Sequence, residues 1–452
     1  MSTHTTPTPA ALPDPYVPES GSAGYRVLHY ALDLSCKLAG NRLDGRAVIT
    51  AVAVEELARI EVDLIGLQAS KVQVNGKKAA KYSQRRGKLL ITPAQPVAAG
   101  AELQLDIRYG GTPQPRMGTW GDVGWEELED GVLVAGQPNG AATWFPCNDH
   151  PSQKATFELA ISTDAGYRAI SNGELVAHGR TASQEHWRYR QAEPMATYLA
   201  TLQIGRYTVQ PLEPEREEDP HQTAFTPAVL ARRTRTALKD QPRMMATFIE
   251  AFGPYPFDAY AVVVTEDELE IPLEAQGLSI IGRNHLAPGW EQQRLIAHEL
   301  SHQWFGNSLT ASRWQDIWMH EGFACYAEWI WSDASGGLDC AAQANAAWEL
   351  LAAGPQDLEV GRPGAEDMFD DRVYKRGALA VHALRCAVGD AEFFSTVRAW
   401  VAQNRHGSVD YPAFAAFLEA RGPAGFDADA VLSPWLFQPE LPPMPAAAPT
   451  PR

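Results

Sequence analysis

Apolar residues between Tyr25 and Tyr207 recur in short runs, and several runs alternate with polar residues. Alternation with a period of two is typical of β-strands that bury one face. Asn75-Gly76 lies between alternating residues and is a strong signal of a two-residue hairpin turn. Because no helical pattern intervenes, we expect an antiparallel β domain. Its clearest predicted strands are residues 25–36, 46–54, 58–66, 102–109, 156–163 and 197–207.

From residue 208 the pattern of apolar and polar residues changes. A charged, proline-containing stretch is followed by longer segments in which apolar residues recur near every 3.6 positions, as in amphipathic helices. One short apolar run, 259–266, has the character of a strand instead. We therefore expect a largely helical second domain with a few strands at its start. Helices are predicted over 237–253, 292–306, 317–331, 376–388 and 411–421.

The length of 452 residues exceeds what one compact core usually accommodates, so two domains are expected. The fold class is α+β, with the β domain over 23–207 and the mainly helical domain over 208–437. Residues 1–22 and 438–452 are rich in Pro and Ala and show no periodicity, which predicts flexible tails.

Charge and cysteine content narrow the possible functions. The formal net charge of −17 argues against a nucleic-acid partner, which requires a basic face. The five cysteines are scattered and never paired as CxxC, so neither a disulfide framework nor a thiolate metal site is indicated. No secretory signal and no membrane-length apolar run is present, which favours a cytoplasmic protein. A monomer is the default expectation.

The strongest chemical signal is the HExxH pattern at 298–302, inside the predicted helix 292–306. Residues four positions apart lie one turn apart on the same helix face, so His298 and His302 can bind one metal ion. Glu299 lies about 100° further around the helix, beside the metal. A general base acting on a metal-bound water must lie there.

A catalytic zinc ion needs three protein ligands and one open position. Glu321 follows His302 at an interval that fits the end of one helix, a loop and the start of the next. We therefore predict one Zn²⁺ per chain, bound by His298, His302 and Glu321. Glu328, two turns after Glu321, is a candidate for orienting a ligand histidine by hydrogen bonding. A solvated helix glutamate is the alternative at that position.

Five segments resemble the gluzincin aminopeptidases of peptidase family M1, which include aminopeptidase N and the bifunctional leukotriene hydrolases. They occur in the family's order, and the similarity extends from about residue 25 to about residue 435. The segments are GQPNGAATWFPCNDHPSQKATFEL (136–159), EAFGPYPFDAYAVVV (250–264), LIAHELSHQWFGN (295–307), DIWMHEGFACYAEW (316–329) and DRVYKRGALAVHALR (371–385).

This resemblance implies a saddle-like β domain followed by a thermolysin-like catalytic domain. Many family members also have a large C-terminal helical domain, and this chain is too short to contain it. The chain is similar to the short bacterial form. The activity implied is hydrolysis of the N-terminal peptide bond of peptides that have a free N-terminus.

The resemblance also implies residue roles. Glu274 matches the glutamate of the family's GxMEN motif, which binds the α-ammonium group of the substrate, although Ala275 replaces the motif's Asn and Ile271 its Gly. Gln137 matches a position that also contacts the substrate's N-terminus. Tyr374 matches the tyrosine that hydrogen-bonds the tetrahedral oxyanion. Without the motifs, a solvated loop glutamate, a surface-loop glutamine and a core tyrosine are the ordinary interpretations.

Three other functions remain to be separated from an aminopeptidase. A thermolysin-like endopeptidase shares the two metal-binding helices, and N-blocked peptides would distinguish it. An additional epoxide hydrolase activity would require turnover of a lipid epoxide. A non-catalytic scaffold would bind zinc without hydrolysing aminoacyl reporters.

Overall fold

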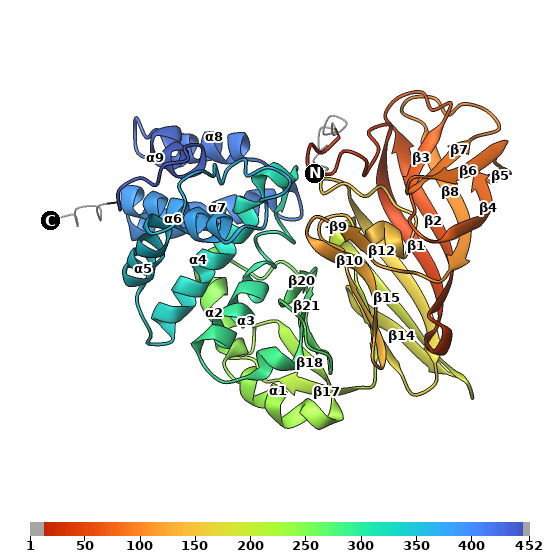
Figure 1. Cartoon of the computed structure of the whole chain (residues 1–452), viewed down its shortest axis with the longest axis horizontal. Helices are drawn as coiled ribbons and strands as arrows, with labels where there is room; N and C mark the ends of the chain where they lie inside the picture. The colour runs from red at the N-terminus through yellow and green to blue at the C-terminus, as the bar shows by residue number, and fades with distance from the viewer. Residues whose placement is uncertain (1–12, 446–452) are drawn as a thin grey trace. The chain divides into compact units, whose positions relative to one another are not determined.

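The computed structural model describes residues 13–445, which form two compact units (Figure 1). Unit 1 contains the chain up to Glu127 together with Gly131–Ser171 and Leu175–Leu202. Unit 2 contains Leu128–Asp130, Asn172–Glu174 and the chain from Gln203. Unit 1 is built from strands and unit 2 mainly from helices, so the predicted order of a β domain and a helical domain is confirmed. The exact boundary at 207/208 stays a prediction.

The largest described sheet of unit 1 has the strand order β14-β15-β12-β1-β2-β8-β4-β5. The pairs β12–β15, β1–β2, β2–β8, β4–β8 and β4–β5 are antiparallel, whereas β1 and β12 pair in parallel from His29–Thr156 to Ser35–Ser162. That pair departs from the purely antiparallel expectation, because β12 joins β1 after a long excursion of the chain. The strands are β1 (Tyr25–Lys37), β2 (Arg42–Ala53), β4 (Gln68–Val74), β5 (Lys77–Lys78), β8 (Glu102–Gly111), β12 (Lys154–Asp164), β14 (Glu174–Arg180) and β15 (Gln184–Ala196).

The hairpin predicted at Asn75-Gly76 is confirmed. Both residues have positive φ, 49° and 73°, as a two-residue turn between antiparallel strands requires. Two smaller described sheets have the orders β13-β16-β11-β10-β9 and β3-β7-β6. Their strands are β3 (Ile60–Asp63), β6 (Lys81–Arg85), β7 (Lys88–Thr92), β9 (Arg116–Gly118), β10 (Gly121–Leu128), β11 (Gly131–Ala135), β13 (Arg168–Ser171) and β16 (Leu202–Gly205).

Unit 2 begins with a mixed sheet in the order β17-β18-β19-β21-β20. The strand β20 is short and lies at one side of this sheet, paired with β21 so that Glu274 is opposite Ser279. A separate two-stranded pair is formed by β22 and β23. The strands are β17 (Tyr207–Leu212), β18 (His221–Pro227), β19 (Ala259–Val264), β20 (Leu273–Ala275), β21 (Leu278–Ile281), β22 (Thr310–Ala311) and β23 (Ser408–Val409).

The helices of unit 2 surround a core in which α4 packs against α3, α5 and α6 (Figure 1). Helix α4 is buried along almost its whole length, and its polar residues Glu321 and Glu328 are buried together with its aromatic ones. None of the helices in the described chain is both long enough and apolar enough to cross a membrane. The helices are α1 (Ala231–Ala237), α2 (Gln241–Phe252), α3 (Trp290–Ser301), α4 (Trp318–Ala334), α5 (Cys340–Ala352), α6 (Asp371–Val388), α7 (Asp390–Asn404), α8 (Tyr411–Arg421) and α9 (Ala428–Leu436).

Residues near both described ends of the chain, which lie within the predicted tails, make contacts with the rest of the chain. Val17 is buried, and the amide of Gly21 donates to the Asp63 carboxylate at 2.9 Å. At the other end, the Trp348 indole donates to the carbonyl of Pro442 at 2.8 Å. Proline-rich segments lack helical periodicity but still offer carbonyl acceptors, and here those acceptors are used. Residues 1–12 and 446–452 of the predicted tails lie outside the described residues.

Candidate active site

Two successive helices bring the predicted metal ligands together. Helix α3 carries His298 and Glu299 in its last turn, and His302 follows as its C-cap residue with helical φ and ψ angles. The His302 amide donates to the His298 carbonyl at 3.2 Å, which keeps the two residues one turn apart. Their imidazole rings therefore lie side by side, with centroids 4.8 Å apart.

Helix α4 supplies the carboxylate. Glu321 lies in its first turn, where an acidic residue also complements the positive end of the helix dipole. One carboxylate oxygen, Oε2 of Glu321, lies 3.2 Å from Nε2 of His298 and 3.5 Å from Nε2 of His302. All three side chains are buried, and their ligand atoms form a compact triangle.

The size of this triangle fits a zinc ion. Ligand atoms about 2.0–2.1 Å from one tetrahedral zinc are about 3.3 Å apart. The two distances between Glu321 and the histidines, 3.2 Å and 3.5 Å, bracket this value. Two imidazoles and one carboxylate are also the donor set of many catalytic zinc sites. The residues present therefore suit zinc and leave a fourth position for other ligands.

Both histidines are oriented through their other ring nitrogen. Nδ1 of His298 lies 2.8 Å from Oε1 of Glu328, and Nδ1 of His302 lies 3.0 Å from the carbonyl oxygen of Phe305. A carbonyl oxygen and an ionised carboxylate only accept hydrogen bonds, so each Nδ1 is assigned as the donor. Each Nε2 is then free to bind metal through its lone pair.

Glu328 is held in turn by two cations. Its Oε2 atom lies 3.4 Å from Nη1 of Arg294 and 4.0 Å from Nζ of Lys375. Burial acts to raise the pKa of Glu328, but Lys375 and His298 outweigh burial and keep the pKa below its usual range. Sequence reasoning singled out Glu328 alone. The partners come from α3 and α6, and no local sequence signal marks them.

The pKa values of Glu299 and Glu274 shift in the direction opposite to that of Glu328. Burial raises the pKa of Glu299 well above its usual range, and burial likewise raises the pKa of Glu274. Ligand atoms of Glu274, Glu299 and His302 lie within 4.8 Å of one another. Oε2 of Glu299 and Oε1 of Glu274 are both buried without a hydrogen-bond partner in the described chain. Buried carboxylate oxygens are costly to leave unpaired, which marks this as a binding region.

The strand that carries Glu274 is fixed by the segment that follows α3. The side-chain amides of Gln303 and Asn307 donate to the Ala275 carbonyl at 3.1 Å and 2.9 Å. The amide of Gly277 donates to the Gln303 side chain at 2.8 Å. Sequence reasoning missed these roles of Gln303 and Asn307, although both lie in the 295–307 motif. These contacts use the backbone carbonyl of Ala275, so they do not depend on the asparagine side chain that the GxMEN motif has at this position.

Tyr374 reaches the same region from the first turns of α6. Its ring stacks on the imidazole of His298, with centroids 5.9 Å apart and an interplanar angle of 24°. Burial, together with the charges of Glu321 and Glu274, raises the pKa of Tyr374 well above its usual value. Its hydroxyl is therefore protonated at neutral pH and can donate a hydrogen bond.

The sequence matches the Peptidase family M1 domain over residues 236–435 and the Peptidase M1 N-terminal domain over residues 26–199. The structure is also similar to that of an M1 zinc metallopeptidase from Deinococcus radiodurans. The TM-score is 0.88 and the identity 30%, and the similarity covers 97% of this chain and 100% of that chain. The chain belongs to peptidase family M1. The resemblance inferred from the five segments is thereby confirmed, and so is zinc as the cofactor.

Curated members of family M1 are more distant. A leucyl aminopeptidase from Saccharolobus solfataricus is 24% identical over 416 residues, which cover 85% of this chain and 50% of the relative. Aminopeptidase N from Lactococcus lactis is 28% identical over 324 residues, which cover 66% of this chain and 38% of the relative. The chain thus spans about half the length, or less, of these curated relatives.

The remaining residue expected from the family M1 pattern is Gln137, which lies in unit 1 just after β11. Its side chain is half-buried, and Nε2 has no hydrogen-bond partner in the described chain. The other predicted site residues all lie in unit 2. The role of Gln137 therefore stays a prediction from the sequence motif.

Proposed function

We propose that this chain is a zinc-dependent aminopeptidase that hydrolyses the N-terminal peptide bond of peptides with a free α-amino group. The observation that carries the proposal is the Glu274 carboxylate. The side chain is half-buried, its Oε1 atom is buried without a hydrogen-bond partner in the described chain, and it lies next to Glu299 and the metal ligand His302. A carboxylate in this position selects a peptide whose positively charged N-terminus lies beside it.

The charges of the site support this assignment. The carboxylates of Glu274, Glu299 and Glu321 together carry three negative charges when ionised, and a zinc ion supplies two positive charges. One ammonium group would bring the sum to zero. Buried charges are tolerated when they are paired, so a bound α-ammonium group would complete the site electrostatically.

Each residue would then have a defined task. When bound by His298, His302 and Glu321, zinc supplies Lewis-acid chemistry at the scissile carbonyl. Glu299 accepts the proton of the attacking water and returns it to the leaving amine, a role suited to its raised pKa. The protonated hydroxyl of Tyr374 donates to the developing oxyanion.

The substrate's terminus and the ligand geometry are assigned to other residues. Glu274 binds the ammonium group, and Gln137 is proposed to add a neutral hydrogen bond on the basis of the sequence motif alone. Glu328 holds His298 in the orientation that points Nε2 at the metal. A structure of the Deinococcus radiodurans relative, in mutant form, has a Tyr-Ser-Ala substrate bound, which supports small peptides as the substrate class.

The proposal also covers the partners, the oligomeric state and the location of the protein. Peptides are the expected partners, a monomer is the default state, and a cytoplasmic location is expected. All five cysteines are free thiols, which agrees with a reducing compartment. An endopeptidase, an additional epoxide hydrolase activity and a non-catalytic scaffold are less well supported, because the unpaired Glu274 oxygen next to the metal residues has no task in them.

The proposal is tested with matched peptide substrates. Initial rates are measured on aminoacyl reporters and on a tripeptide, each with a free and an N-acetylated terminus. The zinc-loaded protein should cleave the free forms at least about 100-fold faster, because an uncharged acetyl group leaves Glu274 unpaired. Chelation should abolish the activity, and added zinc should restore it. Equal cleavage of the acetylated forms would instead identify an endopeptidase.

A further inference from the structure

Arg376 makes an unusual set of contacts outside the metal site. Its side chain is only 4% exposed, yet no salt bridge to it is found in the described chain. The guanidinium instead donates to four backbone carbonyls of the C-terminal segment 434–440. These are Pro439 at 2.7 Å, Glu440 at 2.9 Å, Pro434 at 3.0 Å and Gln438.

The position of these carbonyls follows from the end of α9. The last carbonyls of a helix lack partners within the helix, and the negative end of its dipole attracts a cation. Pro434 lies in the last turn of α9, and the next residues turn over the guanidinium. Arg376 therefore caps α9 and the C-terminal segment together. Burial lowers the pKa of Arg376 to about 10, which still leaves it charged at neutral pH.

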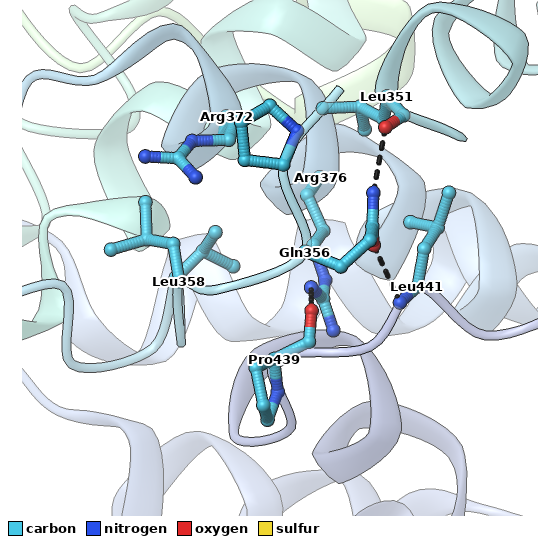
Figure 2. A pocket seen from close by; sticks show the side chains of 9 residues that line it. Leu351, Gln356, Leu358, Arg372, Arg376, Pro439 and Leu441 are labelled. Carbon is cyan, nitrogen blue, oxygen red and sulfur yellow. Dashed lines mark hydrogen bonds between the residues drawn. The ribbon is translucent and has the colours of Figure 1, made fainter. Parts of the chain in front are cut away.

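Neighbouring contacts hold the C-terminal segment in place. Figure 2 shows the Gln356 side chain between Leu351 and Leu441. Gln356 donates to the Leu351 carbonyl at 2.7 Å and accepts from the Leu441 amide at 2.8 Å. The amide of Gly361 donates to the Leu436 carbonyl at 2.7 Å. The C-terminal segment, through Leu436, and the following Leu441 are thus bound to the loop before α6, and Gln356 of that loop is bound to the end of α5.

Arg376 and Tyr374 lie on opposite sides of α6. A separation of two residues corresponds to about 200° around a helix. Tyr374 accordingly stacks on His298, while Arg376 points toward Pro439 (Figure 2). Residues 353–370 contain no helix or strand, so no regular element leads into α6 and fixes its first turns. The contacts of Arg376 add a restraint on this side of α6 to those given by the Asp370 cap and by packing against α4.

We propose that Arg376 is a positioning residue that holds α6, and with it the Tyr374 hydroxyl, by binding the carbonyls of the C-terminal segment 434–440. The inference rests on the proposed function, because Tyr374 has a task only if an oxyanion forms. It adds that the end of the described chain contributes to catalysis without contacting the substrate.

A double-mutant cycle tests this inference. Arg376→Met should lower kcat about 10- to 100-fold with KM changed less than about twofold, because a displacement of about 1 Å can cost about 100-fold. Arg376→Lys, which keeps the charge but fewer donors, should lose less. In a Tyr374→Phe background, Arg376→Met should have almost no further effect on kcat. An equally large loss in that background would overturn the inference.

A binding measurement separates this inference from the proposed function. Calorimetry with a phosphinic dipeptide, a tetrahedral anionic analogue, should show about 10-fold or more weaker binding to zinc-loaded Arg376→Met, whereas binding of a free amino acid should be unchanged. Full analogue affinity in Arg376→Met would refute the positioning role even if the enzyme is active. If the parent protein has no peptidase activity but Arg376→Met still binds the analogue more weakly than the parent does, the positioning role is supported and the proposed function is refuted.

Two further variants guard against misfolding as the explanation. Arg372→Met is the matched control, because Arg372 is another arginine of α6 that, like Arg376, lines the pocket drawn in Figure 2. Unlike Arg376, it pairs with Asp370 and Asp357. It should leave kcat within about twofold of the parent value. A chain ending at residue 437 loses three of the four carbonyls and should reproduce the kcat defect of Arg376→Met. Normal kcat in that truncated chain would count against the inference.

Discussion

Gly322 of α4 and Gly377 of α6 touch backbone to backbone. A β-carbon placed on Gly322 would lie 2.7 Å from the carbonyl carbon of Gly377, and one placed on Gly377 would lie 2.9 Å from the α-carbon of Gly322. Gly322 follows the metal ligand Glu321, and Gly377 lies one turn after Tyr374. The close crossing of the two helices therefore contributes, from the side of α4, to how near Tyr374 comes to the metal site.

Gly377→Ala should separate α4 from α6, because the added methyl group has only backbone to displace. We expect a loss of about 1–3 kcal/mol in the free energy of unfolding, as for overpacked cores, and a lower kcat. Denaturant unfolding and steady-state kinetics measure the two effects. Gly354→Ala is the control, since its nearest neighbour would lie at an ordinary 3.5 Å. Equal stability of the two variants would contradict the steric argument.

Glu299→Ala should keep the zinc ion but lower kcat by about 100-fold or more, because it removes the proton acceptor and no metal ligand. Metal analysis of the dialysed variant and its rate on an aminoacyl reporter check both parts. A zinc-loaded variant with near-parental kcat would show that another group acts as the base.

Glu274→Ala should affect substrates with a free amine selectively. Without the carboxylate, the α-ammonium group loses a charge-assisted hydrogen bond, and kcat/KM should fall about 10- to 100-fold. The comparison is made on aminoacyl reporters, with Glu270→Ala, in the segment just before β20, as an exposed acidic control. If both variants lose the same factor, the anchoring role of Glu274 is wrong.

Glu328→Gln should weaken zinc binding about 10- to 100-fold, as loss of a hydrogen-bond partner to a ligand histidine commonly does. The carboxylate accepts from His298 and is held by Arg294 and Lys375. Competition with a chromogenic chelator gives the affinity. Glu349→Gln on the exposed face of α5 is the matched control. Unchanged zinc affinity in Glu328→Gln would show that Glu328 does not orient His298 for zinc binding.

The buried Asp149 of unit 1 should make stability depend on pH. Burial, and then the charge of Asp63, raise the pKa of Asp149 from 3.8 to about 7 in the folded protein. The folded state thus binds the proton more tightly. The resulting stabilisation is complete below about pH 4 and is lost as the pH rises through 7.

Asp149→Asn should therefore have a flatter stability profile between pH 5 and 8 than the parent. The difference in slope should be at most about 1.4 kcal/mol per pH unit for a single group. Thermal unfolding at several pH values measures it, with the exposed Asp122→Asn as the control. Parallel profiles of parent and Asp149→Asn would mean that Asp149 does not titrate in this range.

Local patterns were enough to predict the elements that carry the chemistry. The spacing of His298 and His302 lies within one helical turn, and Glu321 falls in the first turn of the next helix. Alternation along 25–36 and the Asn75-Gly76 turn likewise predicted β1 and the β4–β5 hairpin. These features depend on backbone geometry over a few residues, which the sequence expresses directly.

Contacts between distant residues were not predictable in this way. Lys375 reaches Glu328 across two helices, Gln303 binds the carbonyl of Ala275, and Arg376 binds carbonyls about 60 residues further along the chain. Residues 438–440, expected to belong to a flexible tail, supply carbonyls to Arg376. Nothing in the local pattern records such pairings, because they use side-chain reach and backbone acceptors.

The sequence by itself therefore determined the chemistry of this protein, since metal ligands at helical spacing specify which atoms can meet one ion. Only the tertiary structure decided how those atoms are held. The crossing of Gly322 and Gly377, the cations behind Glu328 and the carbonyls around Arg376 arise when helices far apart in sequence pack together. Packing depends on the shape of the whole core, and that shape is a property of the folded chain.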